Sequence, residues 1–425
     1  MRRALLLASL LPACTGAPAS SPTTPADAAV SDAAVPDAAA ADVAPDAPAC
    51  FPSAAQPMPR ADAAGAVDPA TGALYVFGGD VGPVVSCMSQ PAFSGETWRY
   101  DPRCDRWTQV PTDTHPSPRA RAAVAVDPNR HRMLMFGGRA RTGSSGAYTL
   151  YPDLWSFDFA TQQWELLYAK GTAPSARANA TLVVDDATDT AVVFGGNTST
   201  NGLAFAPRGD AFRFDLVNHE WSPITASPTP PAREFHAAAM MRGAMWIVSG
   251  GDANAFTGPF LHDAWRLDFG TWRWSQVTLG GDTDALLGRI NHGLVSRGDD
   301  LLLFGGHDDG ALGNRNDVST LDGTGAVAQR AAGDTPGTPG SGFCNFPADF
   351  VTPDDASPER RSAFVFAADP ARHRALLYGG KTDCGTAGDV WSLDLDTLVW
   401  SALRSTTDGL SCPRSGRTTC RDLCT

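Results

Sequence analysis

A short apolar run that ends in two adjacent glycines occurs six times and constrains the fold more than any other feature of the chain. The copies read LYVFGGD (74–80), MLMFGGR (133–139), AVVFGGN (191–197), WIVSGGD (246–252), LLLFGGH (301–307) and ALLYGGK (375–381). Their second glycines are separated by 59, 58, 55, 55 and 74 residues. Intervals of this size indicate a repeated supersecondary unit that fills most of the 425 residues.

Each unit carries further residues at fixed distances after its glycines. In the first unit an acidic residue, Glu96, is followed by Trp98 and then by Asp101. Nine positions after the first aromatic residue, five units have a tryptophan: Trp107, Trp164, Trp221, Trp274 and Trp400. A spacing shared by five of six units predicts that the indoles perform the same packing task in each unit.

The unit at 289–330 breaks this rule. It keeps Asp317 and Asp322, but Ser319 and Ala328 occupy its two aromatic positions. The frame of the unit therefore survives while the large packing side chains are lost. We predict that this unit is the loosest of the six.

Turn residues divide each unit into four short strands. In the second unit the strands are expected near Ala122–Val126, Arg132–Phe136, Asp153–Asp158 and Trp164–Leu167. The 42 glycines and 33 prolines of the chain also favour many short strands joined by tight turns. Four-stranded units repeated about one axis predict a β-propeller, in which no sheet edge stays long and exposed.

The double glycine, the spaced aromatics and an arginine at the start of each unit together resemble the kelch repeat. These arginines are Arg60, Arg119, Arg177, Arg233, Arg289 and Arg360. The resemblance implies an all-β, six-bladed kelch-type propeller of four-stranded antiparallel blades. It also implies that the glycines lie near the axis, where a Cβ would clash and positive φ is required, and that the tryptophans pack between blades.

The first 49 residues have a different character. Arg2 and Arg3 precede the apolar run ALLLASLL at 4–11, as in a secretory signal. The next residues, Leu11-Pro12-Ala13-Cys14, resemble a bacterial lipobox, whose cysteine is lipidated; the alternative is an ordinary secretory signal with Cys14 as a bystander. The stretch 15–48 is almost wholly Ala, Pro, Asp, Ser, Thr and Val, and predicts a disordered, extended tether.

The predicted domains are a lipoprotein signal peptide at 1–13, a tether at 14–49 and a propeller at 50–425. Blades are expected at about 59–110, 118–168, 174–224, 231–277, 287–330 and 358–403, followed by a disulfide-stapled tail at 404–425. The leading apolar run is shorter than the roughly 20 residues that a membrane-spanning helix needs. We therefore expect membrane attachment through a lipid anchor only.

Besides Cys14 the chain has eight cysteines, and an even number in an exported protein predicts up to four disulfides. They are Cys50, Cys87, Cys104, Cys344, Cys384, Cys412, Cys420 and Cys424. Their position near the two ends of the folded part fits reinforcement of ring closure. Cys344–Cys384 is the first pair we expect, and the other pairings stay open. No spacing fits a zinc site, so neither a metal nor another cofactor is expected.

The residues that directly follow the glycine pairs are the candidate ligand-binding residues. They are Asp80, Arg139, Asn197, Asp252, His307 and Lys381. We expect them to ring one mouth of the central channel together with the loops between second and third strands, where propellers usually bind ligands. The alternative is that they are solvated loop starts.

Other polar residues have structural interpretations. The R-x-x-H pattern places His236 and His292 near the channel, where two imidazoles could ligate a metal or act as acid and base. The same pattern serves structural hydrogen bonding in kelch repeats. His131 and His373 are expected in solvated turns, and Asp263 and its equivalents are expected to accept hydrogen bonds from amides of the next turn. No catalytic residue is assigned.

The net charge of −13 and the lack of a long basic block argue against a nucleic-acid partner. No nucleophile elbow, phosphate-binding loop or HExxH motif occurs in the sequence. The sequence favours a monomeric, lipid-anchored, non-catalytic module in the bacterial cell envelope, at the outer membrane or cell surface, that binds protein or glycan ligands at the loop face. The alternatives are a carbohydrate-modifying envelope enzyme of the epimerase or oxidase type, with His236, His292 and His307 in the channel, and an architectural envelope component.

Overall fold

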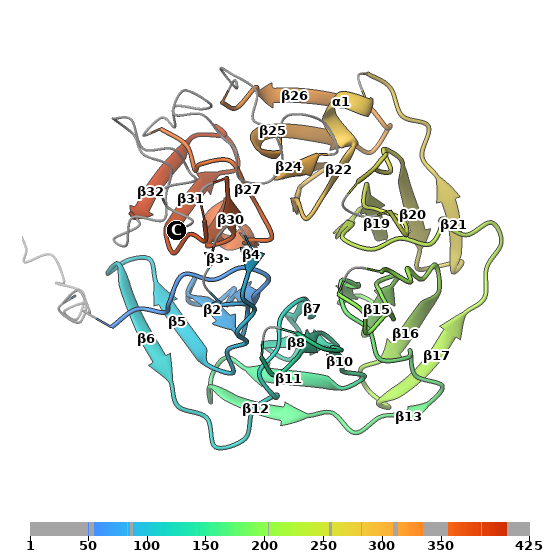
Figure 1. Ribbon diagram of the computed structural model, residues 1–425. Coiled ribbons are helices and arrows are strands. Elements are labelled where there is room, and N and C mark those ends of the chain that lie inside the picture. Colours follow the sequence, from blue (N-terminus) through green and yellow to red (C-terminus); the bar gives the residue numbers. More distant parts are fainter. Residues whose placement is uncertain are drawn as a thin grey trace, which may run out of the picture. The chain divides into compact units, whose positions relative to one another are not determined.

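The chain folds as a ring of small sheets, seen in a computed structural model. The structure describes residue 50 and the ranges 55–82, 84–85, 88–143, 145–202, 204–254, 257–281, 283–308, 313–334, 356–383 and 385–405. The chain divides into two units, Met1–Ala49 and Cys50–Thr425, and all described residues belong to the second. In that unit six antiparallel blades follow one another around a ring in sequence order (Figure 1). The predicted six-bladed propeller is confirmed.

Each blade is built from consecutive strands. Blade 1 has β1 (Ala64–Val67), β2 (Leu74–Phe77), β5 (Thr97–Asp101) and β6 (Arg106–Val110). Blade 2 has β7 (Ala123–Asp127), β8 (Arg132–Phe136), β11 (Leu154–Asp158) and β12 (Gln163–Leu166). Blade 3 has β14 (Thr181–Asp185), β15 (Thr190–Phe194), β16 (Ala211–Asp215) and β17 (Glu220–Ile224).

The second half of the ring repeats this plan. Blade 4 has β18 (Ala237–Met241), β19 (Ala244–Val248), β20 (Ala264–Asp268) and β21 (Arg273–Gln276). Blade 5 has β22 (Arg289–Ile290), β23 (Gly293–Arg297), β24 (Asp300–Asp308), β25 (Asn314–Asp322) and β26 (Val327–Ala331). Blade 6 has β28 (Val365–Asp369), β29 (Arg374–Tyr378), β31 (Val390–Asp394) and β32 (Trp400–Arg404).

Short elements decorate the blades. Two-stranded ladders join β3 (Val84–Val85) to β4 (Met88–Ser89), β9 (Arg139–Ala140) to β10 (Thr149–Leu150), and β27 (Arg361–Ser362) to β30 (Lys381–Thr382). A fifth strand, β13 (Lys170–Gly171), runs parallel to β17 at the rim of blade 3. Helix α1 (Thr283–Leu287) precedes blade 5, and a 3-10 turn, η1 (Pro370–Arg372), follows β28.

The ring closes through the same contacts that join its other blades. The first strands of neighbouring blades contact one another around the axis, including β1 with β28. The Gly380 N–H donates to the Arg60 carbonyl (2.9 Å), just as the Gly138 N–H donates to the Arg177 carbonyl (2.9 Å). In the part of the chain that the structure describes, each blade therefore uses strands from one stretch of sequence, and no strand is exchanged between blades 1 and 6.

The glycine pair takes left-handed backbone conformations that other residues rarely adopt. Gly78 and Gly79 have φ of 68° and 94°. A Cβ on Gly79 would lie 2.9 Å from the carbonyl oxygen of Ala61, on the innermost part of the same blade. Both requirements select glycine where the second strand turns away from the axis, as expected from the sequence.

The repeated tryptophans pack between blades, which confirms their predicted role. The Trp164 ring lies 5.1 Å from the Phe77 ring of the preceding blade and buries almost all of its surface. The same contact recurs in the pairs Trp107–Tyr378, Trp221–Phe136, Trp274–Phe194 and Trp400–Phe304. In each pair the partner is the last residue before the glycines of the preceding blade.

An arginine–carboxylate pair fixes every blade internally. Arg233 Nη1 donates to the Ser249 carbonyl (2.9 Å) and to Asp263 (2.7 Å), and the Trp265 indole also donates to Asp263 (2.8 Å). The expectation that Asp263 caps a turn is therefore wrong, because its oxygens face this guanidinium and indole. The later aspartate of the repeat performs that task, since Asp268 accepts the Thr271 N–H (2.7 Å).

Three positions of the repeat differ from the sequence assignment. In blade 4 Ser249, with φ of 60°, takes the place of the first glycine, because its carbonyl accepts from Arg233 as Gly78 accepts from Arg60. In blade 6 Arg361, and not Arg360, donates to the first glycine, Gly379. In blade 5 the outer turn is one residue shorter, and Val327 pairs with Leu321 where Trp107 pairs with Tyr100. Val327 therefore occupies the indole position that the sequence assigned to Ala328.

A disulfide joins Cys50 to Cys104 in the turn between β5 and β6. This pairing was left open by the sequence. The expected Cys344–Cys384 pair lies outside the described residues, as do Cys14, Cys87, Cys412, Cys420, Cys424, the leader and the tether.

Candidate functional site

Six residues in left-handed conformation form a small ring around the axis, which we call the hub. They are Asp62, Arg121, Asn179, Phe235, Asn291 and Ala363, with φ between 53° and 61°. Their backbones form a relay between blades, in which the Arg121 N–H donates to the Asp62 carbonyl (2.8 Å) and the Asp62 N–H donates to the Ala363 carbonyl (2.8 Å). The relay holds the blade starts close together around the axis.

Charged side chains gather on the hub from blades 1, 2 and 6. Arg121 and Asp62 form an ion pair (3.1 Å), and both side chains are nearly buried. Burial acts to raise the pKa of Asp62, but the positive charges of Arg121, Lys381 and Arg139 outweigh it and lower the pKa. Asp62 therefore stays ionised and is surrounded by more positive than negative charge.

Arg139 is the most confined of these cations. Its guanidinium lies 4.0 Å from the centre of the Tyr148 ring, and the guanidinium of Arg141 lies 4.6 Å from the same centre. Burial, reinforced by the charge of Arg121, lowers the pKa of Arg139 to about 10. Its Nε and Nη1 have no hydrogen-bond partner among the described residues. Arg141 is partly exposed, so the stack opens to solvent at its outer end.

A buried carboxyl faces these arginines from blade 4. Glu234 is fully buried, and its Oε2 accepts from Asn179 Nδ2 (2.8 Å). Burial raises the pKa of Glu234 to about 7, although the Asn179 hydrogen bond and the charges of Arg121 and Arg139 act in the other direction. A buried carboxyl whose pKa lies well above its ordinary value thus stands next to the hub.

The six candidate residues do come together at this mouth, with one change of register. Gly251 pairs with Glu234 where Asp80 pairs with Ala61, so Asp252 lies one residue beyond the ring position that the sequence assigned to it. Arg139 and Asn197 are buried, while Asp80, His307 and Lys381 are partly buried. The ring is therefore covered by its own loops, and the ligand-binding role of these residues stays a prediction.

Two of the candidates hold the covering loops in place. Asp80 Oδ1 accepts the backbone N–H groups of Gly82 (3.0 Å) and Ala92 (2.9 Å), at the two ends of one loop. Asn197 Oδ1 does the same for Ser199 (3.0 Å) and Ala206 (2.8 Å). This shared geometry gives both residues a structural task that the sequence left open.

Aromatic residues cover the opposite side of the mouth. Phe235, Phe260 and Ile290 form a buried cluster against which Phe205 packs. Phe205 and Phe260 come from the loops between second and third strands of blades 3 and 4. The mouth is therefore asymmetric, with charged groups from blades 1, 2 and 6 and an apolar cluster from blades 3, 4 and 5. The two sets meet where the Arg121 guanidinium lies 5.0 Å from the centre of the Phe235 ring.

The two histidines of the R-x-x-H pattern lie between blades. His236 contacts Thr181 Oγ1 through Nε2 (2.8 Å) and packs edge-on against Phe194 of blade 3. Burial and the charge of Arg233 lower the pKa of His236, and burial with the charge of Arg289 lowers that of His292 to about 3. Both imidazoles are neutral and more than nine-tenths buried, which supports their structural interpretation.

The turn histidines are more exposed. His131 lies 3.0 Å from Asp68 and His373 lies 3.4 Å from Asp396, and both adopt positive φ in first-hairpin turns. They occupy the turns that the sequence assigned to them.

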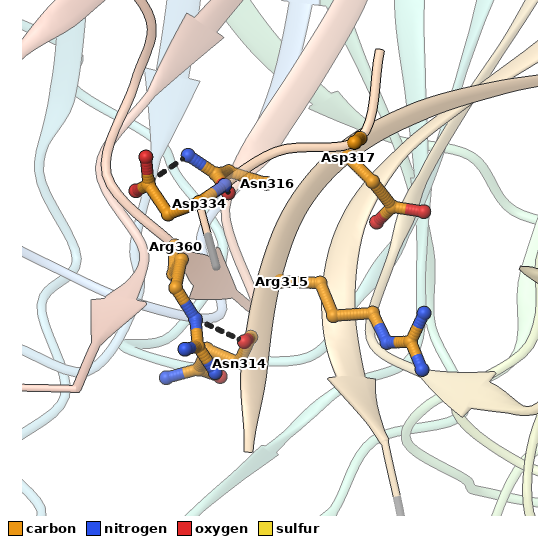
Figure 2. Close-up of a pocket in the computed structure, with 7 residues that line it drawn as sticks. Asn314, Arg315, Asn316, Asp317, Asp334 and Arg360 are labelled. Carbon is orange, nitrogen blue, oxygen red and sulfur yellow. Dashed lines mark hydrogen bonds between the residues drawn. The ribbon is translucent and has the colours of Figure 1, made fainter. Parts of the chain in front are cut away.

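A pocket lies at blade 5, and none of its lining residues belongs to the hub. Figure 2 shows its lining residues: Asn314, Arg315, Asn316, Asp317, Ala332, Asp334 and Arg360. Asn316 donates to Asp334 (2.9 Å) and to the Pro358 carbonyl (3.0 Å), so it holds both described ends of the long insertion between blades 5 and 6. The pocket is polar, and its charged groups are engaged within the protein, since Arg315 pairs with Asp308 (2.8 Å) and Asp317 with Arg289 (2.7 Å).

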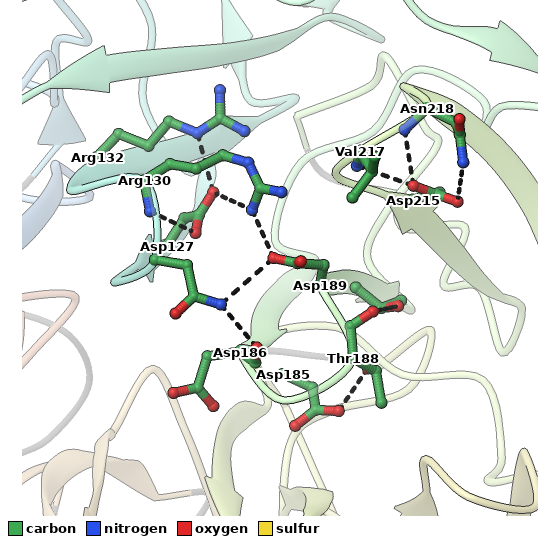
Figure 3. A network of polar contacts seen from close by, with 12 residues as sticks. Asp127, Arg130, Arg132, Asp185, Asp186, Thr188, Asp189, Asp215, Val217 and Asn218 are labelled. Carbon is green, nitrogen blue, oxygen red and sulfur yellow. Dashed lines mark hydrogen bonds and ion pairs between the residues drawn. The ribbon is translucent and has the colours of Figure 1, made fainter.

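Ion pairs also link blades through their first-hairpin turns. Figure 3 shows Arg130 between Asp127 of blade 2 (3.4 Å) and Asp189 of blade 3 (2.7 Å). Asn129 donates to the Asp186 carbonyl of blade 3 (2.7 Å). These contacts fasten neighbouring blades and leave few free groups for a ligand.

Sequence reasoning missed the hub residues, including Asp62 and Arg121, and it also missed Glu234 beside them. Arginine, phenylalanine and alanine seldom adopt positive φ, so nothing in their identity marks a left-handed turn. A usable signal was present, because each hub residue follows the repeat arginine by two positions. Among the described residues, no group of three His, Cys, Asp or Glu side chains could hold a metal ion. The helices found in the described ranges include none that is long and apolar enough to cross a membrane.

Comparison with known proteins agrees with the architecture. Kelch domain-containing protein 3 of Rattus norvegicus is 28% identical over 225 residues, covering 50% of this chain and 55% of that protein. Kelch domain-containing protein 10 of Xenopus laevis is 25% identical over 244 residues, covering 55% and 56%. The chain thus spans about half the length of these relatives.

A longer and more partial match is the Leucine-zipper-like transcriptional regulator 1 homolog of Drosophila melanogaster, 26% identical over 311 residues, or 62% of this chain and 30% of that protein. The sequence profile of the KLHDC2/KLHL20/DRC7 Kelch-repeats domain matches residues 66–306, more than half of the chain. That range runs from β1 into β24, while the ring contains a further blade beyond it. The chain therefore belongs to the KLHDC2/KLHL20/DRC7 Kelch-repeats domain family.

Proposed function

We propose that this chain is a monomeric, lipid-anchored binding protein of the bacterial cell envelope that holds protein or glycan ligands at the hub mouth and catalyses no reaction. A kelch propeller fits a protein-interaction module. The lipobox-like Leu11-Pro12-Ala13-Cys14 and the Ala/Pro/Asp-rich stretch after it support an anchor and a tether.

The asymmetric mouth is the observation that carries the proposal. Arg141 is partly exposed above Tyr148, and an apolar cluster around Phe260 lies on the opposite side of the same ring of loops. A cationic, stacked side chain next to apolar surface can recognise a ligand that presents polar and apolar groups together. Loops held by a rigid scaffold are also where propellers place variable contacts.

The buried histidines weigh against the enzymatic alternative. A general acid or base must reach the substrate, whereas His236 and His292 lie between blades and are neutral. We therefore retain binding as the proposed function.

The binding proposal is tested by exposing the full-length chain to a printed array of bacterial surface glycans and to an unstructured peptide library. Arg141→Ala should weaken any binding by roughly fivefold, because one stacked cation is worth about 1 kcal/mol. Arg106→Ala, an exposed arginine at the start of β6, is the matched control and should leave binding unchanged. Equal loss in both variants, or no loss in either, would place the ligand elsewhere.

The anchor is tested separately by phase partition in a non-ionic detergent. The wild-type chain produced in a bacterium should enter the detergent phase, and Cys14→Ser should move it to the aqueous phase. Cys412→Ser serves as the control and should still enter the detergent phase. A wild-type chain that stays in the aqueous phase would contradict the lipid anchor and favour an ordinary secretory signal.

A further inference from the structure

Glu234 occupies an unusual place for a carboxyl group. Its backbone pairs with Gly251 at the ring position of blade 4, and its side chain turns toward blades 2 and 3. Oε2 accepts one hydrogen bond, from Asn179, while Oε1 has no partner among the described residues. A buried carboxylate with one unsatisfied oxygen is costly, whereas a protonated carboxyl needs fewer acceptor contacts.

The charged groups that face Glu234 come from blade 2. Arg121 projects from the hub and Arg139 from β9, and both act on the carboxyl electrostatically. Blade 3 contributes the neutral amide of Asn179, and blade 4 contributes the neutral imidazole of His236 two residues away. Among the described residues, the one other acid of this group is Asp62, and it is paired with Arg121.

The two arginines are incompletely paired. Arg121 spends Nε on Asp62, while its Nη1 has no partner among the residues that the structure describes. Arg139 is stacked on Tyr148, and its Nε and Nη1 likewise have no hydrogen-bond partner among the described residues. With Glu234 ionised, two carboxylates face two guanidinium groups and Lys381; with Glu234 protonated, Asp62 alone balances them.

We propose that Glu234 is a proton-operated charge switch beneath the mouth, which makes the hub one unit more positive when the surroundings become mildly acidic. The switch itself stands on the cluster just described, and its effect on ligands rests on the proposed binding function. Burial raises the pKa of this carboxyl to about 7, which places the switch near neutral pH.

The direction of the linked change in stability follows from this shift. The carboxyl has a folded pKa of about 7, above its ordinary value of 4.5. Below pH 4.5 both folded and unfolded chains hold the proton, so the group costs nothing. As pH rises from 4.5 to 7, the unfolded chain releases its proton more readily, and stability falls; above pH 7 the cost stays constant.

The first experiment follows the carboxyl directly in the full-length, ligand-free protein. The chain has only five glutamates, at positions 96, 165, 220, 234 and 359. Side-chain carboxyl ¹³C labelling of glutamate should therefore give few NMR signals, one of which titrates with a midpoint near pH 7. Glu234→Gln should remove that signal, and Glu165→Gln, an exposed glutamate on β12, should leave it in place. No carboxyl titrating between pH 6 and 8 would overturn the proposal.

The second experiment compares unfolding midpoints in urea at pH 5 and pH 7.5. The urea midpoint of the wild-type protein should be lower at pH 7.5 than at pH 5. In Glu234→Gln most of this difference between the two midpoints should disappear, whereas Glu165→Gln should retain it. Parallel curves for wild type and Glu234→Gln would contradict the switch. Both experiments need no ligand, so their failure is distinct from failure of the binding screen. If Glu234→Gln does not fold, the wild-type NMR titration still decides the matter.

Discussion

The seam between blades 1 and 2 and the seam between blades 4 and 5 fill the same space with different side chains. In the first, Trp164 packs against Phe77, and its N–H donates to Thr97 Oγ1 (2.9 Å). In the second, Val248 and Val327 stand in the places of the aromatic pair. Leu286 and Leu287 of α1 belong to the same buried cluster and supply the missing apolar volume.

Polar contacts differ between these seams as well. Arg121–Asp62 is a nearly buried pair across the first seam, whereas Arg242–Asp299 across the second is largely exposed. Exposed pairs contribute little to stability. The comparison teaches that the space between two blades is filled in both seams, although different residues fill it. The tryptophan of the repeat is absent at the seam where helix α1 contributes apolar side chains.

The largest expected effect separates the two seams by their central side chains. Trp164→Ala should lower the free energy of unfolding by about 4 kcal/mol, because it removes an indole that is almost wholly buried. Val327→Ala should cost about 2 kcal/mol, since less volume is lost and neighbouring leucines remain. Urea unfolding of both variants measures the difference. Equal costs would mean that the second seam depends on its valine as much as the first depends on its indole.

A second contrast concerns the arginine–carboxylate pairs of blades 5 and 1. Arg289→Met should cost about 3 kcal/mol, because it leaves Asp317 unpaired with only 4% of its side chain exposed. Arg60→Met should cost roughly half as much, since Glu96 is 44% exposed and water can solvate it. Both arginines also donate to a glycine carbonyl, so that loss is common to the two variants. Equal unfolding energies would show that the carboxylate's surroundings do not matter.

Ser249 offers a smaller test of the same region. Its φ of 60° costs a non-glycine residue about 1 kcal/mol, so Ser249→Gly should raise stability by about that amount. The matched change at the equivalent site, Gly195→Ser, should destabilise blade 3, where a Cβ would lie 2.9 Å from His236 Cε1. Thermal unfolding distinguishes the outcomes, and a destabilised Ser249→Gly would undo the register given for blade 4.

The smallest effect concerns local opening. Blade 5 lacks the indole of its neighbours, and its amides in β26 should exchange with deuterium roughly threefold faster than those in β12. Hydrogen-exchange mass spectrometry of the full chain measures both strands. Equal protection would show that α1 compensates fully, and the predicted looseness of blade 5 would then be wrong.

The sequence was sufficient for the ring and insufficient for its registers. Repeated glycines and tryptophans have physical roles that only those residues fill well, so their spacing predicted the number and order of blades. The WIVSGGD copy led to a wrong register for blade 4, because its two glycines stand one position later than the glycine pairs of the other blades. The hydrogen bond from Arg233 to the Ser249 carbonyl reveals this shift. Arg360 and Arg361 are adjacent and identical, so composition offered no basis for choosing between them.

The sequence predicted where the candidate residues lie, but it predicted neither their burial nor the charged groups beside them. The residues after the glycines do meet at one mouth, but their burial depends on loops whose course the repeat does not specify. The raised pKa of Glu234 comes from burial, and it is opposed by Arg121, Arg139 and Asn179, which come from two other blades. Such a combination of charges becomes visible only when the blades stand side by side.

The backbone relay of the hub has a consequence for how the ring can assemble. Blade 6 takes part in this relay on both sides, because Ala363 accepts the Asp62 N–H of blade 1 and donates to the Asn291 carbonyl of blade 5. A row of blades 1 to 5 would leave both of these groups without that partner. The last blade therefore saturates two distant partners in one event. We therefore expect closure of the propeller to be one late, cooperative step in folding, in which blade 6 docks against blades 5 and 1 together.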